Sequence, residues 1–240
     1  MDLIAFLQRR LRKVGLEVRK YSPASSFTAS LSALCCDAGI DLVLDVGASV
    51  GQFAGDLRAA GFRGEIVSFE PLPDAWHALD RAAGRDARWK VHPRCALGAL
   101  AGDVEINVAA NGVSSSVLPM LESHLAAAPE STYRGSVSAV MHRVDDVAGP
   151  YLRQARSPML KIDTQGYEWQ VLDGASGSLP AMRAVAVELS LLPLYEGQRL
   201  WQDVIERLAS EGFDLWSLHP GFADKATGRV LQFDGIFRRP

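Results

Sequence analysis

Residues 41–51 read DLVLDVGASVG, and this stretch decides the expected fold. The apolar run Asp41–Val46 is short and ends at a glycine, which predicts a buried strand. Gly47 and Gly51 follow it, and a helix is predicted to begin at Gln52. Glycines in such a turn let a ligand approach the backbone beside the free N–H groups of the helix N-terminus. The turn is therefore a candidate binding loop, although its G-x-x-x-G spacing differs from the G-x-G-x-x-G of dinucleotide-binding folds.

Strands and helices alternate along most of the chain after this stretch. Further strands are predicted at residues 65–70, 89–95, 158–162, 184–189, 213–218 and 230–238, with helices at 52–60, 73–83 and 200–210 and one beginning at 168. This alternation predicts βαβ units and an α/β fold, with a mostly parallel sheet that carries helices on both faces.

Residues 99–150 interrupt the alternation and are expected to form a mid-chain insert. Val104–Ala109 and Val137–Val140 alternate apolar and polar residues, which predicts a hairpin. Between them, residues 119–135 are expected to form a long loop that acts as a mobile lid over the acceptor. The predicted organisation is a helical extension at 1–38 and one domain at 39–240 that contains this insert.

Composition sets the broad class. Hydrophobic residues make up 48% and charged residues 22% of the 240 positions, which fits one globular domain and excludes disorder. A net charge of -3 argues against a general nucleic-acid binder. Two of the three cysteines, Cys35 and Cys36, are adjacent, so a disulfide framework is not expected. With no bilayer-length apolar run and no signal peptide, we expect a cytoplasmic protein.

The first twenty residues have a distinct character. Leu3, Phe6, Leu7, Leu11 and Val14 recur at helical spacing among six basic side chains, which predicts a basic amphipathic helix. One interpretation is a helix packed on the domain edge or at a subunit contact of a homo-oligomer. The other is docking to an anionic membrane surface, and the sequence leaves both open.

Glu70 gives the candidate loop a ligand class. It stands at the end of the second predicted strand, 19 residues past Gly51. A carboxylate there can accept two hydrogen bonds from ribose hydroxyls. Together with the glycine loop, Glu70 favours a ligand with an adenosine moiety over a turn that is glycine-rich only for its geometry.

Motifs along the chain resemble those of a known family. The segments DVGASVGQF, VSFEP, CALG, VSSSVLPM, LKIDTQGYE and VELS occur in the order of the FkbM-type S-adenosylmethionine-dependent methyltransferases. The resemblance runs from about Leu42 to the C-terminus. It implies a class I methyltransferase-like (Rossmann-like) fold with seven strands, and transfer of a methyl group to an oxygen, commonly a sugar or polyketide hydroxyl.

The resemblance also assigns residues. It implies a cofactor loop containing Asp45, Gly47, Ser49 and Gly51, a ribose-binding acid at Glu70, and an adenine pocket at Ala96 and Leu97. Lys161, Asp163, Gly166 and Glu168 match the family segment K-I-D-x-x-G-x-E. Two positions depart from the family pattern: Ser49, where Asn is frequent, can still form hydrogen bonds, whereas Gln165, where Glu is frequent, cannot act as a base.

Methyl transfer to a hydroxyl sets its own requirements. The sulfonium leaving group departs neutral, so the protein must align the acceptor and share or remove its proton. Asp163, at the end of the fourth strand, is the first candidate for this role, the alternative being a cap for the following helix. Glu188 ends the fifth strand and is either a substrate contact or a structural partner.

Other side chains are weaker candidates. His142 is the best histidine for a general base, the alternative being a plain loop residue. Ser115, within the serine triplet, and His124 and Gln165 are candidates for the acceptor pocket, and for the serines a polar turn between strands is an equal alternative. Asp145 and Asp146 together with Asp163 would offer oxygen ligands to Mg²⁺, although adjacent aspartates usually begin a helix or turn.

The favoured function is therefore S-adenosylmethionine-dependent O-methylation of a saccharide or glycosylated metabolite. One rival is a nicotinamide-dependent oxidoreductase on a similar sheet, which the missing glycine and the absence of a Tyr-x-x-x-Lys signature disfavour. The other rival is a non-catalytic binding module that retains the fold, which the intact Asp45, Glu70 and Asp163 disfavour.

Overall fold

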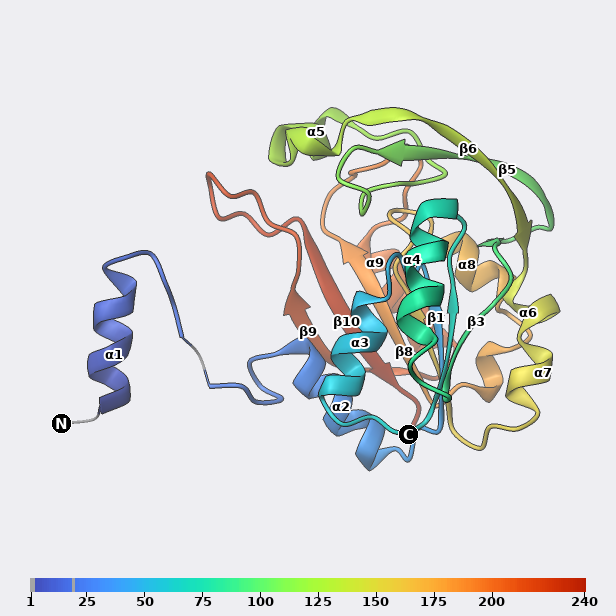
Figure 1. Cartoon of the computed structure of the whole chain (residues 1–240), viewed down its shortest axis with the longest axis horizontal. Helices are drawn as coiled ribbons and strands as arrows, with labels where there is room; N and C mark the ends of the chain where they lie inside the picture. Colours follow the sequence, from blue (N-terminus) through green and yellow to red (C-terminus); the bar gives the residue numbers. More distant parts are fainter. Residues whose placement is uncertain (1–2, 19) are drawn as a thin grey trace.

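The computed structural model describes residues 3–18 and 20–240, so the part of the N-terminal prediction that falls on Met1, Asp2 and Arg19 lies outside the described residues. A central sheet carries helices on both sides, and a second, smaller sheet lies above it (Figure 1). The seven strands of the main sheet are ordered β3-β2-β1-β7-β8-β10-β9. In that order they are Trp89–Val91, Glu65–Phe69, Leu42–Val46, Pro158–Ile162, Ala184–Ser190, Gln232–Arg238 and Asp214–Pro220.

The main sheet confirms the predicted fold class. Neighbouring strands run parallel from β3 to β8. Only β10 is antiparallel, to both β8 and β9. Because β1, β2, β7 and β8 are parallel and in register at Val46, Phe69, Ile162 and Val187, their carboxyl ends meet at one edge of the sheet.

Apolar side chains alternate between the two faces of β1, and helices cover both. Val43 packs with Leu31, Leu57 and Leu79 of the helices α2 (Phe27–Asp37), α3 (Gln52–Ala59) and α4 (Pro73–Ala83). Leu44 belongs to the core of the opposite face. That face is covered by α6 (Val144–Val147), α7 (Gly149–Leu152), α8 (Glu168–Gly174) and α9 (Trp201–Ser210), with the short 3-10 helix η2 (Leu179–Ala181). Burial on both faces explains why β1 is apolar without interruption apart from Asp45.

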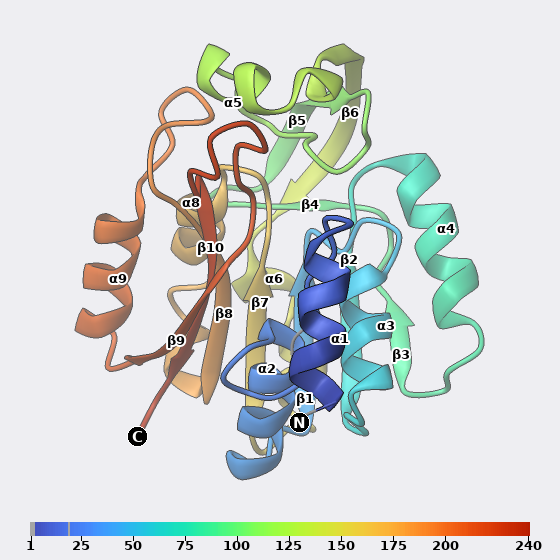
Figure 2. The same cartoon turned by 90° about the vertical axis from the view of Figure 1, so that its left-hand side faces the viewer.

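The insert supplies two of the three strands of a second sheet, whose order is β4-β6-β5. The expected hairpin is present, as β5 (Gly102–Ala109) and β6 (Tyr133–His142) pair antiparallel. The expected long loop is wrong, because α5 (Glu122–Ala127), the 3-10 helix η1 (Pro129–Ser131) and β6 occupy most of it. The second sheet and α5 lie over the carboxyl edge of the main sheet (Figure 2).

One predicted strand is split between the two sheets. The prediction of a strand at residues 89–95 fails after Val91, where β3 ends. Pro93 follows, and proline has no N–H to donate to a strand ladder. The chain then enters the second sheet as β4 (Ala96–Leu97), which pairs with the end of β6.

The N-terminal extension contains two unlike helices. Helix α1 (Leu3–Arg12) stands apart from the sheet and its covering helices (Figure 1). Helix α2 instead buries Leu31 and Leu34 in the main core. We therefore propose a domain boundary before Phe27 rather than at residue 38. Within residues 3–18 and 20–240, no helix is long and apolar enough to cross a membrane.

Candidate functional site

A cavity of about 680 Å³ is lined by residues at the carboxyl ends of the main-sheet strands and by residues of the second sheet. Its lining includes most of the site residues predicted from the sequence: Gly47, Ser49, Glu70, Ala96, Leu97, Ser115, His124, Asp163, Gln165 and Glu188. Asp45, Gly51 and His142 are not part of that lining. The structure therefore brings the predicted cofactor and acceptor residues together, with three exceptions.

The loop after β1 owes its shape to positive backbone φ angles. Gly47, Ser49 and Gly51 have φ of 75°, 48° and 93°. A Cβ on Gly47 would lie 1.8 Å from the backbone oxygen of Asp163, and one on Gly51 would lie 2.8 Å from the ring of Trp89. The glycines are therefore required first by the turn and by the packing of the chain itself, which is the structural alternative that the sequence also offered. Ser49 adopts a conformation that is unusual for a residue with a side chain and lines the cavity.

Glu70, directly after β2, holds this loop through a hydrogen bond to Ser49. Its Oε2 accepts a hydrogen bond from the Ser49 amide at 2.8 Å, and its Oε1 accepts one from the Leu72 amide at 2.9 Å. Only 5% of the residue is exposed, and burial raises its pKa to about 7 despite these two bonds. A carboxylate has about four acceptor positions, so two amides leave room for ligand hydroxyls.

Asp45 has a different position from the one predicted. It is 0% exposed and contributes nothing to the cavity lining. Its Oδ1 lies 3.1 Å from Nζ of Lys161, and its Oδ2 accepts a hydrogen bond from Ser68, which in turn accepts one from Trp89. Its side chain lies within the sheet and pairs with Lys161, outside the cavity lining, so its contact with the cofactor stays a prediction.

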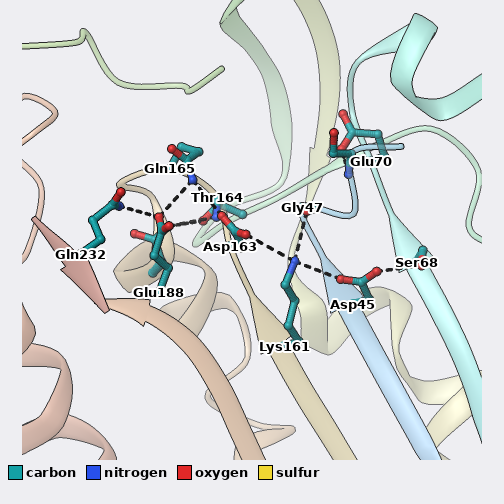
Figure 3. Close-up of polar contacts among 12 residues, drawn as sticks. Asp45, Gly47, Ser68, Glu70, Lys161, Asp163, Thr164, Gln165, Glu188 and Gln232 are labelled. Carbon is teal, nitrogen blue, oxygen red and sulfur yellow. Dashed lines mark hydrogen bonds and ion pairs between the residues drawn. The ribbon is translucent and has the colours of Figure 1, made fainter. Parts of the chain in front are cut away.

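Lys161 lies between the buried Asp45 and the cavity residue Asp163 (Figure 3). Its Nζ lies 3.1 Å from Asp45, 3.3 Å from the carbonyl oxygen of Gly47 and 3.7 Å from Oδ2 of Asp163. The ammonium also lies 5.0 Å from the ring centroid of Phe53. Burial alone would lower the pKa of Lys161, but the two carboxylates outweigh burial and hold this pKa above its ordinary value. The side chain is therefore a fixed cation beside Asp163.

Asp163 is the acidic side chain at the end of β7 that the sequence singled out. Its side chain is 37% exposed and lines the cavity. The alternative that it caps the next helix is wrong, because α8 begins five residues later at Glu168. Glu168 satisfies the connecting loop instead, accepting hydrogen bonds from the amides of Thr164 and Gly166 at 2.9 and 3.1 Å. Burial raises the pKa of Glu168 to about 7.

Gln165 bridges two carboxylates (Figure 3). Its Nε2 donates to Oδ1 of Asp163 at 2.9 Å and to Oε2 of Glu188 at 3.0 Å. Its Oε1 accepts from the Tyr195 hydroxyl at 3.0 Å, and its carbonyl accepts from the Ser116 hydroxyl at 2.6 Å. With φ of 53°, Gln165 is held in a rarely populated backbone region by these bonds. The amide predicted to bind acceptor is therefore already engaged in holding the carboxylates.

Glu188 receives a second amide from a strand that sequence reasoning did not connect with the site. Gln232, on β10, donates to the same Oε2 at 2.5 Å. Burial, and then the neighbouring carboxylates of Asp163 and Glu168, raise the pKa of Glu188 well above its ordinary value. These bonds support the structural-partner interpretation of Glu188, although the residue also lines the cavity.

Of the remaining predicted site residues, His124 and Ser115 line the cavity and His142 does not. His124 is buried, and its ring centroid lies 5.2 Å from that of Tyr195 and 5.2 Å from that of Phe222. Burial lowers the pKa of His124. The hydroxyl of Ser115 accepts a hydrogen bond from Ala109 and shapes a turn at the cavity wall. His142 ends β6 outside the lining, so its prediction as a general base lacks the required position.

The structure does not support the weaker alternative of a magnesium site at Asp145, Asp146 and Asp163. Both oxygens of Asp145 are engaged elsewhere, with Arg143, the Gly177 amide and the Ser178 hydroxyl. Across residues 3–18 and 20–240, no group of three or more His, Cys, Asp or Glu side chains is placed to hold a metal ion. Asp145 joins α6 to the turn after α8 and belongs to the framework.

Sequence reasoning missed the roles of Lys161, Tyr195 and Gln232 in this site. Lys161 had a visible signal, since a lysine inside a buried apolar strand needs an acidic partner. Tyr195 and Gln232 carry no such signal, because they reach the site only through tertiary contacts with Gln165 and Glu188.

Comparisons with known proteins address the family of the chain. The family model described as "Methyltransferase FkbM domain" matches residues 45–215. A curated relative, "Hexuronic acid methyltransferase AglP" of Haloferax volcanii, is 24% identical over 156 residues, which cover 62% of this chain and 56% of the relative. The match thus spans little more than half the length of that relative.

The solved structures that match this chain do so with low identity and low TM-scores. Magnesium protoporphyrin IX methyltransferase from Synechocystis PCC 6803, with bound SAM, is 11% identical, with a TM-score of 0.47 and coverage of 100% of this chain and 98% of the other. The O-methyltransferase NcsB1 from neocarzinostatin biosynthesis is 14% identical, with a TM-score of 0.44 and coverage of 90% and 57%. Because the family model matches well over half of the sequence, the chain belongs to the FkbM methyltransferase family.

Proposed function

We propose that this member of the FkbM family is an S-adenosylmethionine-dependent O-methyltransferase whose acceptor is a hydroxyl of a saccharide or glycosylated metabolite. The observation that carries the proposal is that one cavity contains both the loop around Glu70 and the carboxylate pair bridged by Gln165. The first feature suits an adenosine-containing cofactor, and the second suits a hydroxylated acceptor.

The residues at the cofactor end fit S-adenosylmethionine. Glu70 retains acceptor positions toward the cavity for the ribose hydroxyls. Gly47 and Ser49 bring the backbone to the cavity wall, and Ala96 and Leu97 add an apolar surface for the adenine. When bound, this cofactor supplies a methyl group on a positively charged sulfur.

The acceptor end is assigned to Asp163. Its carboxylate is the partly exposed member of the pair, so it can accept a hydrogen bond from an acceptor hydroxyl and take up the proton. The Lys161 ammonium and the Gln165 amide fix the two oxygens of Asp163. Glu188 acts by holding Gln165 in place. Fixing the carboxylate in this way reduces the reorganisation needed when the hydroxyl loses its proton.

The proposed substrate class rests on the polarity of this end and on the curated relative. Gln165, Glu188, Gln232, Asp234 and Lys225 all line the cavity and offer both donors and acceptors. A saccharide presents many hydroxyls that such side chains can bind. The relative from Haloferax volcanii is described as acting on a hexuronic acid, and we extend only the broader class, a saccharide, to this chain.

An Asp163→Asn variant tests the catalytic assignment. Asparagine keeps the size and much of the hydrogen bonding but removes the basic oxygen, so turnover should fall by about 10²–10⁴, the usual effect of losing a general base. Methyl transfer from labelled S-adenosylmethionine to a panel of saccharide acceptors measures this effect. Asp146→Asn, which alters an acidic side chain outside the cavity lining, is the matched control.

Two results would count against the assignment. Turnover of Asp163→Asn close to that of the unmodified protein would remove Asp163 from the chemistry. Loss of activity on adding a chelator, restored by magnesium, would indicate metal-assisted catalysis in place of the carboxylate.

A further inference from the structure

Residues 6–21, here called the N-terminal arm, carry an unusual share of the exposed apolar surface. Among the described residues thirteen large hydrophobic side chains are exposed, and six of them lie in the arm: Phe6, Leu7, Val14, Leu16, Val18 and Tyr21. Isolated exposed apolar residues are ordinary, but a run of six in one short segment indicates an interaction surface.

The arm is also opposite in charge to the rest of the protein. Residues 6–21 contain six basic side chains and one acidic side chain, a net charge of +5. Since the whole chain has a net charge of -3, the remaining residues sum to -8. The described basic side chains are exposed: Arg9, Arg10, Arg12, Lys13 and Lys20. An anionic partner therefore complements the arm and not the body.

Residues 6–18 of the arm fold back on themselves and stand clear of the sheet and its covering helices (Figure 1). The Leu16 amide donates to the carbonyl of Leu11 at 2.9 Å, which turns the chain back after α1. The Gln8 side chain donates to the carbonyl of Val18 at 3.0 Å and brings the returning segment, which is not a strand, beside the helix. This arrangement gathers apolar and basic side chains of both segments in one unit.

We propose that the N-terminal arm docks on an anionic membrane surface. The apolar side chains would enter the boundary between headgroups and acyl chains, while the arginine and lysine side chains would contact lipid phosphates. Apolar side chains interleaved with basic ones favour a membrane over a nucleic acid. The phosphates of a nucleic acid would bind the basic side chains, but its backbone would leave the aliphatic side chains without an apolar partner. This proposal does not depend on the reaction catalysed in the cavity.

Docking would also orient the cavity. The arm ends at Tyr21, and only residues 22–26 separate it from α2. Phe27 and Thr28, at the start of α2, line the cavity. An arm held on a membrane would therefore keep this wall of the cavity close to the bilayer.

Vesicle co-sedimentation of the full chain tests the proposal. We expect binding to vesicles of phosphatidylcholine mixed with phosphatidylglycerol, little binding to phosphatidylcholine alone, and release by high salt. Arg9→Glu/Arg10→Glu and Phe6→Ser/Leu7→Ser should each weaken binding by about tenfold or more. Arg81→Glu/Arg85→Glu, a matched reversal of two exposed arginines on the body, should bind like the unmodified protein.

Three results would overturn it. Absence of binding to the anionic vesicles is one, and equal weakening by the control variant is another. The third is a dimer, measured by light scattering, that dissociates in both arm variants, because it would assign the surface to a second copy of the chain.

Discussion

At the scale of single residues, the site depends on one buried cation. Lys161 joins Asp45, inside the sheet, to Asp163 at the cavity wall. Asp45 is 0% exposed, so its charge is tolerable only with Lys161 present. The neighbouring strands β1 and β7, otherwise apolar, are thus joined by an ion pair, and the lysine of this pair also lies beside the acid proposed for the reaction.

Replacing this lysine should destabilise the protein more than replacing an exposed one. Lys161→Met leaves Asp45 buried without its partner, and we expect a loss of about 3–5 kcal/mol in the free energy of unfolding. Lys90→Met, which breaks the surface pair between Lys90 and Glu65, should cost less than about 1 kcal/mol. Urea unfolding at neutral pH measures both.

A double variant separates the charge from the packing. Asp45→Asn/Lys161→Met removes both charges and should recover part of the stability lost in Lys161→Met. Equal losses for Lys161→Met and Lys90→Met would contradict the role given to the buried pair.

The residues themselves show what the sequence could and could not predict. Gly47, Glu70 and Asp163 could be placed at the site because each follows a predicted strand, and parallel strands end at one edge. The position of the Asp45 side chain could not be predicted in this way. Successive side chains of a strand point to opposite faces, and the motif does not say which face meets the ligand. Tyr195 reaches Gln165 only through the folded chain.

At the scale of elements, the second sheet is tied to the main body at several places. The Leu121 amide donates to the carbonyl of Leu194, and the Glu196 amide donates to the carbonyl of Pro119, each at 2.9 Å. Ser116 bonds to the loop that holds Asp163. The periodicity of the sequence predicted the hairpin correctly but missed these ties, because they join segments far apart in the chain.

Amide hydrogen exchange tests whether this segment is a mobile lid. Because of the two backbone bonds, we expect the Leu121 and Glu196 amides to exchange at least about tenfold more slowly than that of the exposed turn residue Val113. Slow exchange would mean that any motion of the second sheet carries the turn at residues 193–196 with it. Exchange at Leu121 as fast as at Val113 would support the independent lid inferred from sequence.

At the scale of the whole molecule, the cavity is lined by segments that are far apart in the sequence. The loop after β1, the end of β7, the second sheet and β10 all line it. Alternation of strands and helices was enough to predict the main sheet and its edge. The volume and shape of the cavity were not predictable, since they depend on how the second sheet lies over that edge (Figure 2).

Calorimetric titration with S-adenosylhomocysteine tests the central claim, that this cavity binds the cofactor through Glu70. We predict binding by the unmodified protein and no binding of NAD. Glu70→Ala should weaken binding of S-adenosylhomocysteine by about 1–3 kcal/mol, roughly 5- to 150-fold. Asp163→Asn, at the acceptor end, should keep its affinity. The account would be contradicted by a protein that binds NAD and not S-adenosylhomocysteine, or by a folded Glu70→Ala variant with unchanged affinity.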